Sequence, residues 1–183
     1  MSHRGAFVAD PKQSGWVLQV AQGFFEGEVD HHHRDVKTRV LEAKLKVFPA
    51  EPAKALQLAK GERGFLLRRL RRLHGKVALY SENYLLPELA TVVIGSPALE
   101  PRGSLNRVLH DAGYRISGAR RTVEAVPAPD RIARLLEVAE GAPLLLVTSV
   151  SWKEDGRPFD FYQSWVRTDV VKVTVEASAA LNE

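Results

Sequence analysis

The residues of this chain best suited to bind a charged ligand are four arginines within five positions, Arg68, Arg69, Arg71 and Arg72. On a β-strand, successive side chains point to opposite faces, so Arg69 and Arg71 would share one face of a sheet. A guanidinium that faces a cavity can hold a carboxylate or a phosphate through two parallel hydrogen bonds. The alternative is that all four are solvated or paired with Asp and Glu on neighbouring strands.

Other kinds of chemistry find little support in the residues. The chain has no cysteine, which excludes disulfides, thiolate zinc sites and a cysteine nucleophile. Three consecutive histidines, His31 to His33, do not preset a metal geometry, so no metal site is expected. A glycine-rich phosphate loop, a His-Glu-x-x-His helix and a Gly-x-Ser-x-Gly turn are all missing from the sequence. We therefore expect no cofactor and assign no catalytic residue.

The size and charge of the chain narrow the function classes further. Its 183 residues, 45% of them hydrophobic, suit one domain with at most a small appendage. The net charge of +4 permits an anionic partner without requiring a nucleic acid, and Arg120-Arg121 and the arginine run lack interleaved aromatic residues for base stacking. No apolar run approaches the roughly 18–20 residues of a membrane helix, and no secretion signal is present. A cytoplasmic protein without a membrane partner is expected.

The elements that must position the arginines can be predicted from hydrophobic periodicity and from Gly and Pro. Residues 1–35 show no sustained period and are interpreted as an arm or linker. Strands are predicted over 36–48, 65–73, 77–85, 114–126, 144–152, 159–166 and 170–175. Helices are predicted over 49–58, 104–112 and 127–138, with Ser104 as the N-cap of the second. His74-Gly75-Lys76 and Asp155-Gly156 mark two hairpin turns.

The two halves of the chain resemble each other. The segment from Pro49 to Gly61 corresponds to the segment from Pro127 to Gly141, and a strand–turn–strand follows each glycine. Such a duplicated helix–hairpin unit predicts an α+β fold: one antiparallel sheet with helices on one side and a pseudo-twofold axis. A chance similarity of two hairpins is the alternative.

These motifs together resemble a known family. The stretch 64–71, with Gly75 and Tyr84-Leu85, resembles the first hairpin of the UTRA effector domain, and Ser104-Leu105 before Gly113-Tyr114 resembles its next helix. The stretches 135–145 and 155–160, followed by Arg167 and Asp169, resemble its second half. UTRA domains belong to the HutC subfamily of GntR-family transcriptional regulators and share the internally duplicated chorismate lyase fold.

The resemblance also implies a domain division. Residues 4–8 resemble the last strand of the wing in the family's winged helix-turn-helix. The expected division is a wing remnant and linker over 1–35, with Met1-Ser2-His3 as an added leader, and an effector-binding and dimerisation domain over 36–183. The chain then looks like an effector domain that lacks the DNA-binding domain.

The resemblance further implies roles for individual residues. In relatives the Arg-x-Arg pair matched by Arg69 and Arg71 binds the acidic head of the effector. Ser104 matches a ligand-binding hydroxyl at a helix N-terminus, where free N–H groups favour an anion; its alternative role is N-capping. Asp160 matches an acidic residue that accepts hydrogen bonds from ligand hydroxyls or an amine; its alternative is an ion pair with an arginine. Relatives also carry an acidic residue in the return strand of the first hairpin, and we take Glu82 as the candidate.

Some positions fit the resemblance less closely or serve the fold. Ser81 competes with Glu82 for the register of that return strand, and a tyrosine common in relatives is Val166 here. Arg167 and Asp169 are expected to tie the last strands together rather than to touch a ligand. The catalytic and metal sites are expected to be absent.

The function expected from this reading is that of a sensor. A homodimer would bind a small anionic metabolite, such as a sugar phosphate, a phosphonate or an organic or amino acid. Binding would change the spacing of two DNA-binding heads, with DNA contacted only through the missing N-terminal domain. The alternatives are a chorismate lyase-like enzyme and a dimerisation module without a ligand. A wing remnant favours the regulator, since a free-standing lyase has no use for one.

Overall fold

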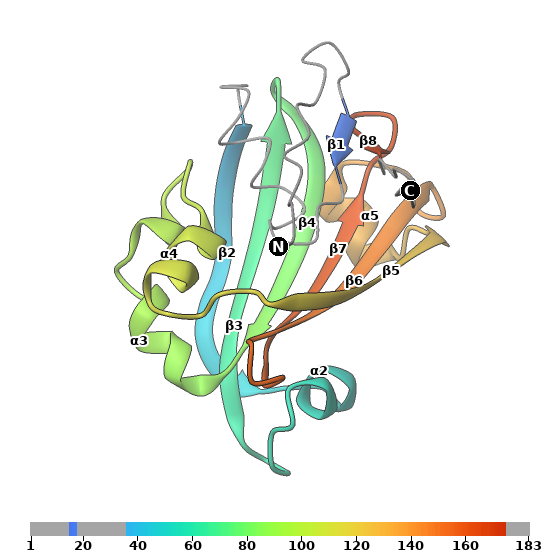
Figure 1. The fold of residues 1–183 in the computed structure, drawn as a ribbon. Coiled ribbons are helices and arrows are strands. Elements are labelled where there is room, and N and C mark those ends of the chain that lie inside the picture. Colours follow the sequence, from blue (N-terminus) through green and yellow to red (C-terminus); the bar gives the residue numbers. More distant parts are fainter. Residues whose placement is uncertain (1–14, 18–35, 175–183) are drawn as a thin grey trace, which may run out of the picture.

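The structure, a computed structural model, describes residues 15–17 and 36–174. Within these residues the fold is α+β, built on a six-stranded antiparallel sheet in the order β2-β3-β4-β7-β6-β5 (Figure 1). Its strands are β2 (Val36–Val47), β3 (Arg63–Leu73), β4 (Lys76–Leu85), β5 (Gly118–Pro127), β6 (Pro143–Trp152) and β7 (Pro158–Val166). A separate parallel pair joins β1 (Gly15–Val17) to β8 (Lys172–Thr174).

The helices are short: the three predicted ones are present with narrower bounds than expected, and three further short helices lie between β4 and α4. They are α2 (Ala50–Ala55), η1 (Pro87–Leu89), α3 (Ala90–Val93), η2 (Pro97–Leu99), α4 (Leu105–Asp111) and α5 (Asp130–Leu136). The hydroxyl of Ser104 caps α4 by accepting a hydrogen bond from the Arg107 N–H at 3.1 Å. This confirms the predicted N-cap, which satisfies one of the N–H groups that a helix leaves open at its start.

The predicted duplication is present in the topology. The first half runs β2–α2–β3–β4 and the second β5–α5–β6–β7, and each half is read inward from one edge of the sheet (Figure 1). β4 and β7 meet at the centre, where Leu79 lies opposite Val166 and Leu85 opposite Asp160. The middle pair of this register is Glu82 with Gln163, so the pseudo-twofold axis passes between them.

Helices α2 and α5 lie on the same face of the sheet. Phe48, just before α2, packs edge-on against Tyr84 at 4.9 Å between ring centroids. Ile132 and Leu136 of α5 pack in a core with Tyr80 of the same strand. Because Tyr80 and Tyr84 are an even number of residues apart, they point to one face. In Figure 1, α5 lies behind the sheet and α4 in front of the β2 edge, so the connection between the halves lies on the other side.

The turn of the first hairpin is followed by a β-bulge. His74 and Gly75 form the turn, both with positive φ, and Leu73 lies opposite Lys76. The pairing then shifts between Arg72 and Arg71, which leaves Ala78 as the extra residue in β4. An inserted residue reverses the faces of everything that follows. Ser81 therefore lies opposite Arg69, and Glu82 points to the opposite face.

None of the helices described is long and apolar enough to cross a membrane.

Candidate functional site

Arg69 and Arg71 lie on one face of β3 and are each only 3% exposed. Arg68 and Arg72 point to the other face, where Arg68 pairs with Glu42 at 2.7 Å and Arg72 pairs with Glu137. The predicted alternation is thus confirmed. One pair is matched to acidic side chains, and the other is buried in the sheet.

Asn83 links two of the predicted site residues. It accepts a hydrogen bond from Arg69 Nη2 at 3.0 Å and donates through Nδ2 to Asp160 Oδ1 and Oδ2 at 3.0 and 3.2 Å. All three side chains are buried. These hydrogen bonds bring Arg69 and Asp160 together across β3, β4 and β7, although the two residues are 91 positions apart in the sequence.

Two further residues extend this group across β7 to β5. Tyr162 lies opposite Asn83, and burial raises the pKa of its phenol, while the charges of Arg71 and Arg69 act in the opposite direction. Burial lowers the pKa of Arg121, against the nearby Tyr162 and Asp160, which favour its charged form. We call Arg69, Arg71, Asn83, Arg121, Asp160 and Tyr162 the polar cluster.

The six side chains of the polar cluster carry more positive than negative charge. Three of them are guanidinium groups, and one, that of Asp160, is a carboxylate. Buried serines of β4, β6 and β7 lie in the same rows of the sheet: Ser81, Ser149 and Ser164. Away from bulk water, charge-assisted hydrogen bonds to guanidinium groups are stronger than those between neutral groups. The arrangement can therefore hold a carboxylate or phosphate, with neutral hydroxyls beside it.

Ser104 lies in the segment that covers the β2 edge. The Thr38 N–H donates to the Pro101 carbonyl at 2.8 Å, and Thr38 is the cross-strand partner of Arg71. The segment that leads into α4 is thus attached to the sheet at the level of Arg71. The Ser104 hydroxyl accepts the hydrogen bond that caps α4.

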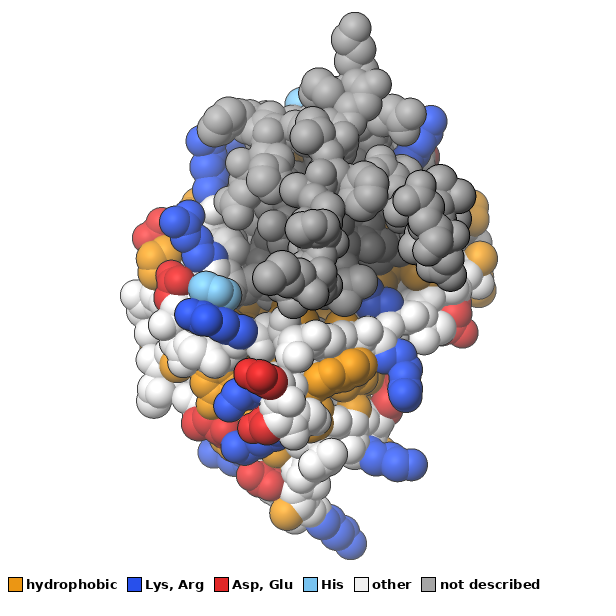
Figure 2. All heavy atoms as spheres, viewed as in Figure 1, with side chains coloured by type: hydrophobic (Ala, Val, Ile, Leu, Met, Phe, Trp, Pro, Cys, Tyr) orange, Lys and Arg blue, Asp and Glu red, His pale blue; other side chains and the backbone are white. Residues whose placement is uncertain are grey.

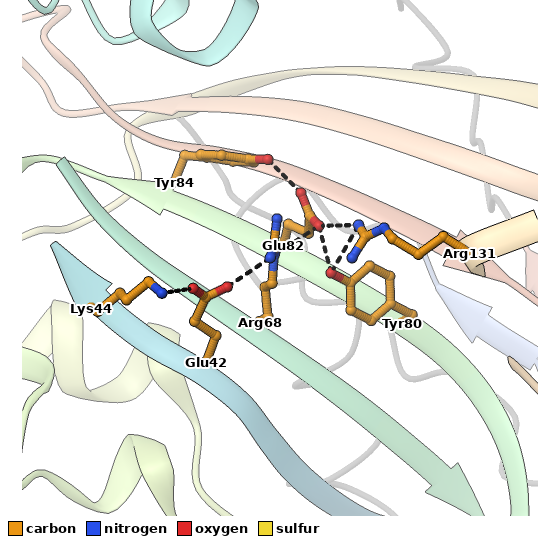
Figure 3. Close-up of polar contacts among 7 residues, drawn as sticks. All are labelled: Glu42, Lys44, Arg68, Tyr80, Glu82, Tyr84 and Arg131. Atoms are coloured by element: carbon orange, nitrogen blue, oxygen red, sulfur yellow. Dashed lines mark hydrogen bonds and ion pairs between the residues drawn. The ribbon is translucent and has the colours of Figure 1, made fainter. Parts of the chain in front are cut away.

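Glu82 is not brought together with Arg69 and Arg71. It is buried on the opposite face, between α2 and α5, where it accepts hydrogen bonds from the hydroxyls of Tyr80 and Tyr84 (Figure 3). Arg68 Nε lies 3.0 Å and Arg131 Nη2 2.9 Å from its Oε1. Burial alone would raise the pKa of Glu82, but the two tyrosine hydrogen bonds and the charge of Arg68 outweigh it and lower the pKa. We call Glu82, Arg68, Arg131, Tyr80 and Tyr84 the Glu82 network.

Arg167 and Asp169 contact the end of the second half of the fold rather than the polar cluster. Arg167 pairs with Asp169 at 2.8 Å and donates to the Leu136 carbonyl at 3.0 Å, which ties the end of β7 to α5.

The wing-like residues 4–8 and the three histidines lie outside the described residues. Among the residues described, no group of His, Asp and Glu could hold a metal ion. In Figure 2, the blue and red side chains of the described surface are intermixed and form no single basic stripe on the visible face.

Three members of the polar cluster were missed in the sequence: Asn83, Arg121 and Tyr162. Strand alternation places Tyr162 on the same face as Asp160, and the pairing of β5 with β6 places Arg121 beside them. The face on which Asn83 lies can be predicted only once the bulge at Ala78 is known, because without the bulge strand alternation places residue 83 on the other face.

Comparison with known proteins agrees with this architecture. Residues 31–172 match the sequence family called the UTRA domain. The chain belongs to the UTRA domain family. By sequence, this UTRA domain is 20% identical over 177 residues to YydK of Bacillus subtilis, described as an HTH-type transcriptional regulator; the match covers 97% of this chain and 73% of YydK.

Solved structures of related proteins have the same fold. A Streptomyces coelicolor protein assigned as a transcriptional regulator is 31% identical with a TM-score of 0.70, over 76% of this chain and 91% of that one. The ligand-binding domain of a Bordetella bronchiseptica protein assigned to the GntR-family regulators is 26% identical with a TM-score of 0.69, over 78% and 89%. This UTRA domain is therefore an effector-binding domain of the kind found in GntR-family transcriptional regulators.

Proposed function

We propose that this UTRA domain, as part of a HutC-type regulator, senses a small anionic metabolite that binds at the polar cluster. The observation that carries the proposal is the pair of buried guanidiniums of Arg69 and Arg71 on one face of β3, joined through Asn83 to Asp160. Guanidinium groups bind carboxylates and phosphates bidentately, and Asp160 is placed to accept a hydrogen bond from an amine or hydroxyl of the same ligand.

The proposed ligand class is a sugar phosphate, a phosphonate or an organic or amino acid. The N-terminal end of α4 at Ser104 and the serines beside the cluster add neutral hydroxyls for the uncharged part of such a ligand. Glu82, which the family resemblance implies as a ligand residue, is not part of this proposal because it lies on the opposite face of the sheet.

In this proposal the domain acts as a homodimer in the cytoplasm. Residues 1–35 carry the end of the wing and the linker to the DNA-binding domain, and DNA is contacted only through that domain. Operator half-sites repeat with the DNA helix, so a modest reorientation of two linked heads changes operator affinity steeply.

The first prediction tests the anion clamp. A thermal-shift panel of inorganic phosphate, glucose 6-phosphate, citrate, glutamate and methylphosphonate should include an anion that stabilises the chain. Replacing both arginines, Arg69→Ala with Arg71→Ala, should then weaken binding of that anion at least a hundredfold in calorimetry, since two charge-assisted contacts are lost.

The control for this experiment is Arg72→Ala, which removes an arginine of the same strand from the other face. It should leave the affinity unchanged. Unchanged affinity in the double variant, with circular dichroism like that of the wild type, would refute the clamp. No shift with any anion would instead favour a dimerisation module without a ligand. Release of pyruvate from chorismate, assayed in parallel, would favour the lyase over the sensor.

A further inference from the structure

The three arginines of the polar cluster lie at two ends of it. Arg69 and Arg71 belong to β3 and Arg121 belongs to β5, with β4, β7 and β6 between them. Neighbouring strands are about 4.8 Å apart, so four strand spacings separate the two backbone positions by about 19 Å. Tyr162, between the two ends, is close enough to all three arginines to interact with their charges. The arginine side chains at both ends therefore reach inward over the strands between them.

Hydroxyl groups occupy the face of the sheet between the two ends. One row across the sheet carries, in order from β4 to β5, Asn83, Tyr162, Ser149 and Arg121. Ser81 lies in the neighbouring row of the same face. Ser81 and Ser149 are 1% and 5% exposed, and their hydroxyls have no hydrogen-bond partner among the residues described. A buried hydroxyl without a partner costs free energy, and a ligand with hydroxyls of its own removes that cost.

A ligand with a single acidic group can use only one of the two ends. Arg69 and Arg71 are about 7 Å apart along one strand, so one carboxylate or phosphate can accept hydrogen bonds from both. Arg121 is four strands away from them. A second acidic group, separated from the first by a short chain, is the chemistry that the second end can bind.

We propose that the effector of this UTRA domain is a short hydroxylated chain with an acidic group at each end, one bound by Arg69 and Arg71 and the other by Arg121. The hydroxyls along the chain pair with Ser81 and Ser149. Sugar diacids and phosphorylated sugar acids have this chemistry. This inference rests on the proposed function, which places an anion at Arg69 and Arg71, and it adds the second anchor and the overall form of the ligand.

The second prediction compares ligands that differ in one acidic group. Glucarate and gluconate have the same six-carbon chain with two carboxylates and one, and 6-phosphogluconate and glucitol 6-phosphate differ from each other in one carboxylate. In calorimetry with the 183-residue chain, the two-acid member of each pair should bind about tenfold or more tightly, because it forms a further charge-assisted contact. Adipate has both carboxylates of glucarate and none of its hydroxyls, so it should bind more weakly than glucarate.

The variant that separates the two ends is Arg121→Gln. It should weaken binding of the two-acid member of each pair about tenfold or more and leave the affinity for the one-acid member within about twofold, since that member is held at Arg69 and Arg71. Unchanged binding of the one-acid member also shows that the variant is folded. The matched control is Arg120→Gln, at the neighbouring exposed position on the opposite face of β5, which should change neither affinity.

The outcomes distinguish this inference from the proposed function. Equal binding of the two members of a pair, or no binding of either two-acid ligand, would overturn the second anchor even if another anion binds at Arg69 and Arg71. An equal loss of both members in Arg121→Gln would overturn it as well. Adipate that binds as tightly as glucarate would overturn the pairing of ligand hydroxyls with the serines. Binding that survives Arg69→Ala with Arg71→Ala would instead overturn the proposed function.

Discussion

At the scale of single residues, Glu82 is the most fully coordinated acid among the described residues, with two tyrosines and two arginines around its carboxylate. It lies at the pseudo-twofold axis, back to back with the polar cluster on the same strand. A buried carboxylate costs desolvation energy, and only several good partners offset it. The Glu82 network therefore fixes β4 against α5, and so holds Asn83 and Ser81 facing the other way.

The third prediction follows from the lowered pKa of Glu82. A carboxyl whose pKa is lower folded than unfolded stabilises the protein above its unfolded pKa, and this stabilisation is lost as pH falls through the folded pKa. Glu82→Gln should thus reduce the free energy of unfolding by about 3 kcal/mol at pH 7. In urea titrations, the difference in unfolding free energy between variant and wild type should shrink as pH falls below 4.5, the ordinary pKa of a glutamate side chain.

The control at the residue scale is Glu42→Gln, whose carboxylate is more exposed and pairs with Arg68 and Lys44. Its loss should cost less than about 1 kcal/mol, as expected for a surface pair. A Glu82→Gln difference that stays constant from pH 7 to pH 3 would contradict the ionised network.

At the scale of elements, the close approach of β3 to the segment before α2 depends on a glycine. A Cβ on Gly64 would lie 2.3 Å from Phe48 Cε2 and 2.8 Å from the Leu85 carbonyl oxygen. Phe48 packs edge-on against Tyr84, whose hydroxyl donates to Glu82. The absence of a side chain at Gly64 therefore lets α2 pack against the Glu82 network.

The fourth prediction is that Gly64→Ala destabilises the domain. Phe48 must move, or β3 must separate from β4, which should cost about 1–3 kcal/mol of unfolding free energy. Chemical denaturation followed by tryptophan fluorescence measures this, with Lys60→Ala in the exposed turn before β3 as the control. A Gly64→Ala variant as stable as the control would show that Phe48 yields freely.

The elements also show which parts of the site the sequence can predict. Strand alternation is local, so the split of Arg69 and Arg71 from Arg68 and Arg72 follows from spacing alone. The face of Glu82 does not follow from spacing alone. If the pairing is continued from the Leu73–Lys76 turn without a bulge, Tyr80 rather than Ser81 lies opposite Arg69. The extra residue Ala78 reverses that assignment, and its position depends on contacts across the sheet, such as the bond from the Arg167 N–H to its carbonyl.

The three shortest helices could not be predicted from the sequence either. η1, α3 and η2 have three or four residues each, too few for a helical period to show in the sequence. The internal duplication was predictable because the order of helix, glycine, strand and turn recurs at long range, and such an order survives small errors in the bounds of each element.

At the scale of the whole molecule, the polar cluster reaches from the first half of the chain to the edge of the second. Arg69 and Arg71 lie on β3, whereas Arg121 lies on β5. An anion held by these groups would reduce the freedom of the two halves relative to each other and so lower the entropy cost of ordering them in the proposed homodimer. In this arrangement the effector and the second subunit favour each other.

The fifth prediction is that anion binding and dimerisation are coupled. A saturating concentration of the panel anion with the largest thermal shift should tighten the dimer about fivefold or more, because coupling between sites commonly has this size. Linkage is reciprocal, and a homodimer holds two anion sites, so a fivefold change in the dimer dissociation constant corresponds to a change of about 2.2-fold in the affinity of each site. Calorimetry at protein concentrations below and above the dimer dissociation constant should therefore show tighter anion binding by the dimer. Equal affinities at the two concentrations would separate sensing from assembly and require the effector to reach the DNA-binding heads through α4 and the β2 edge instead.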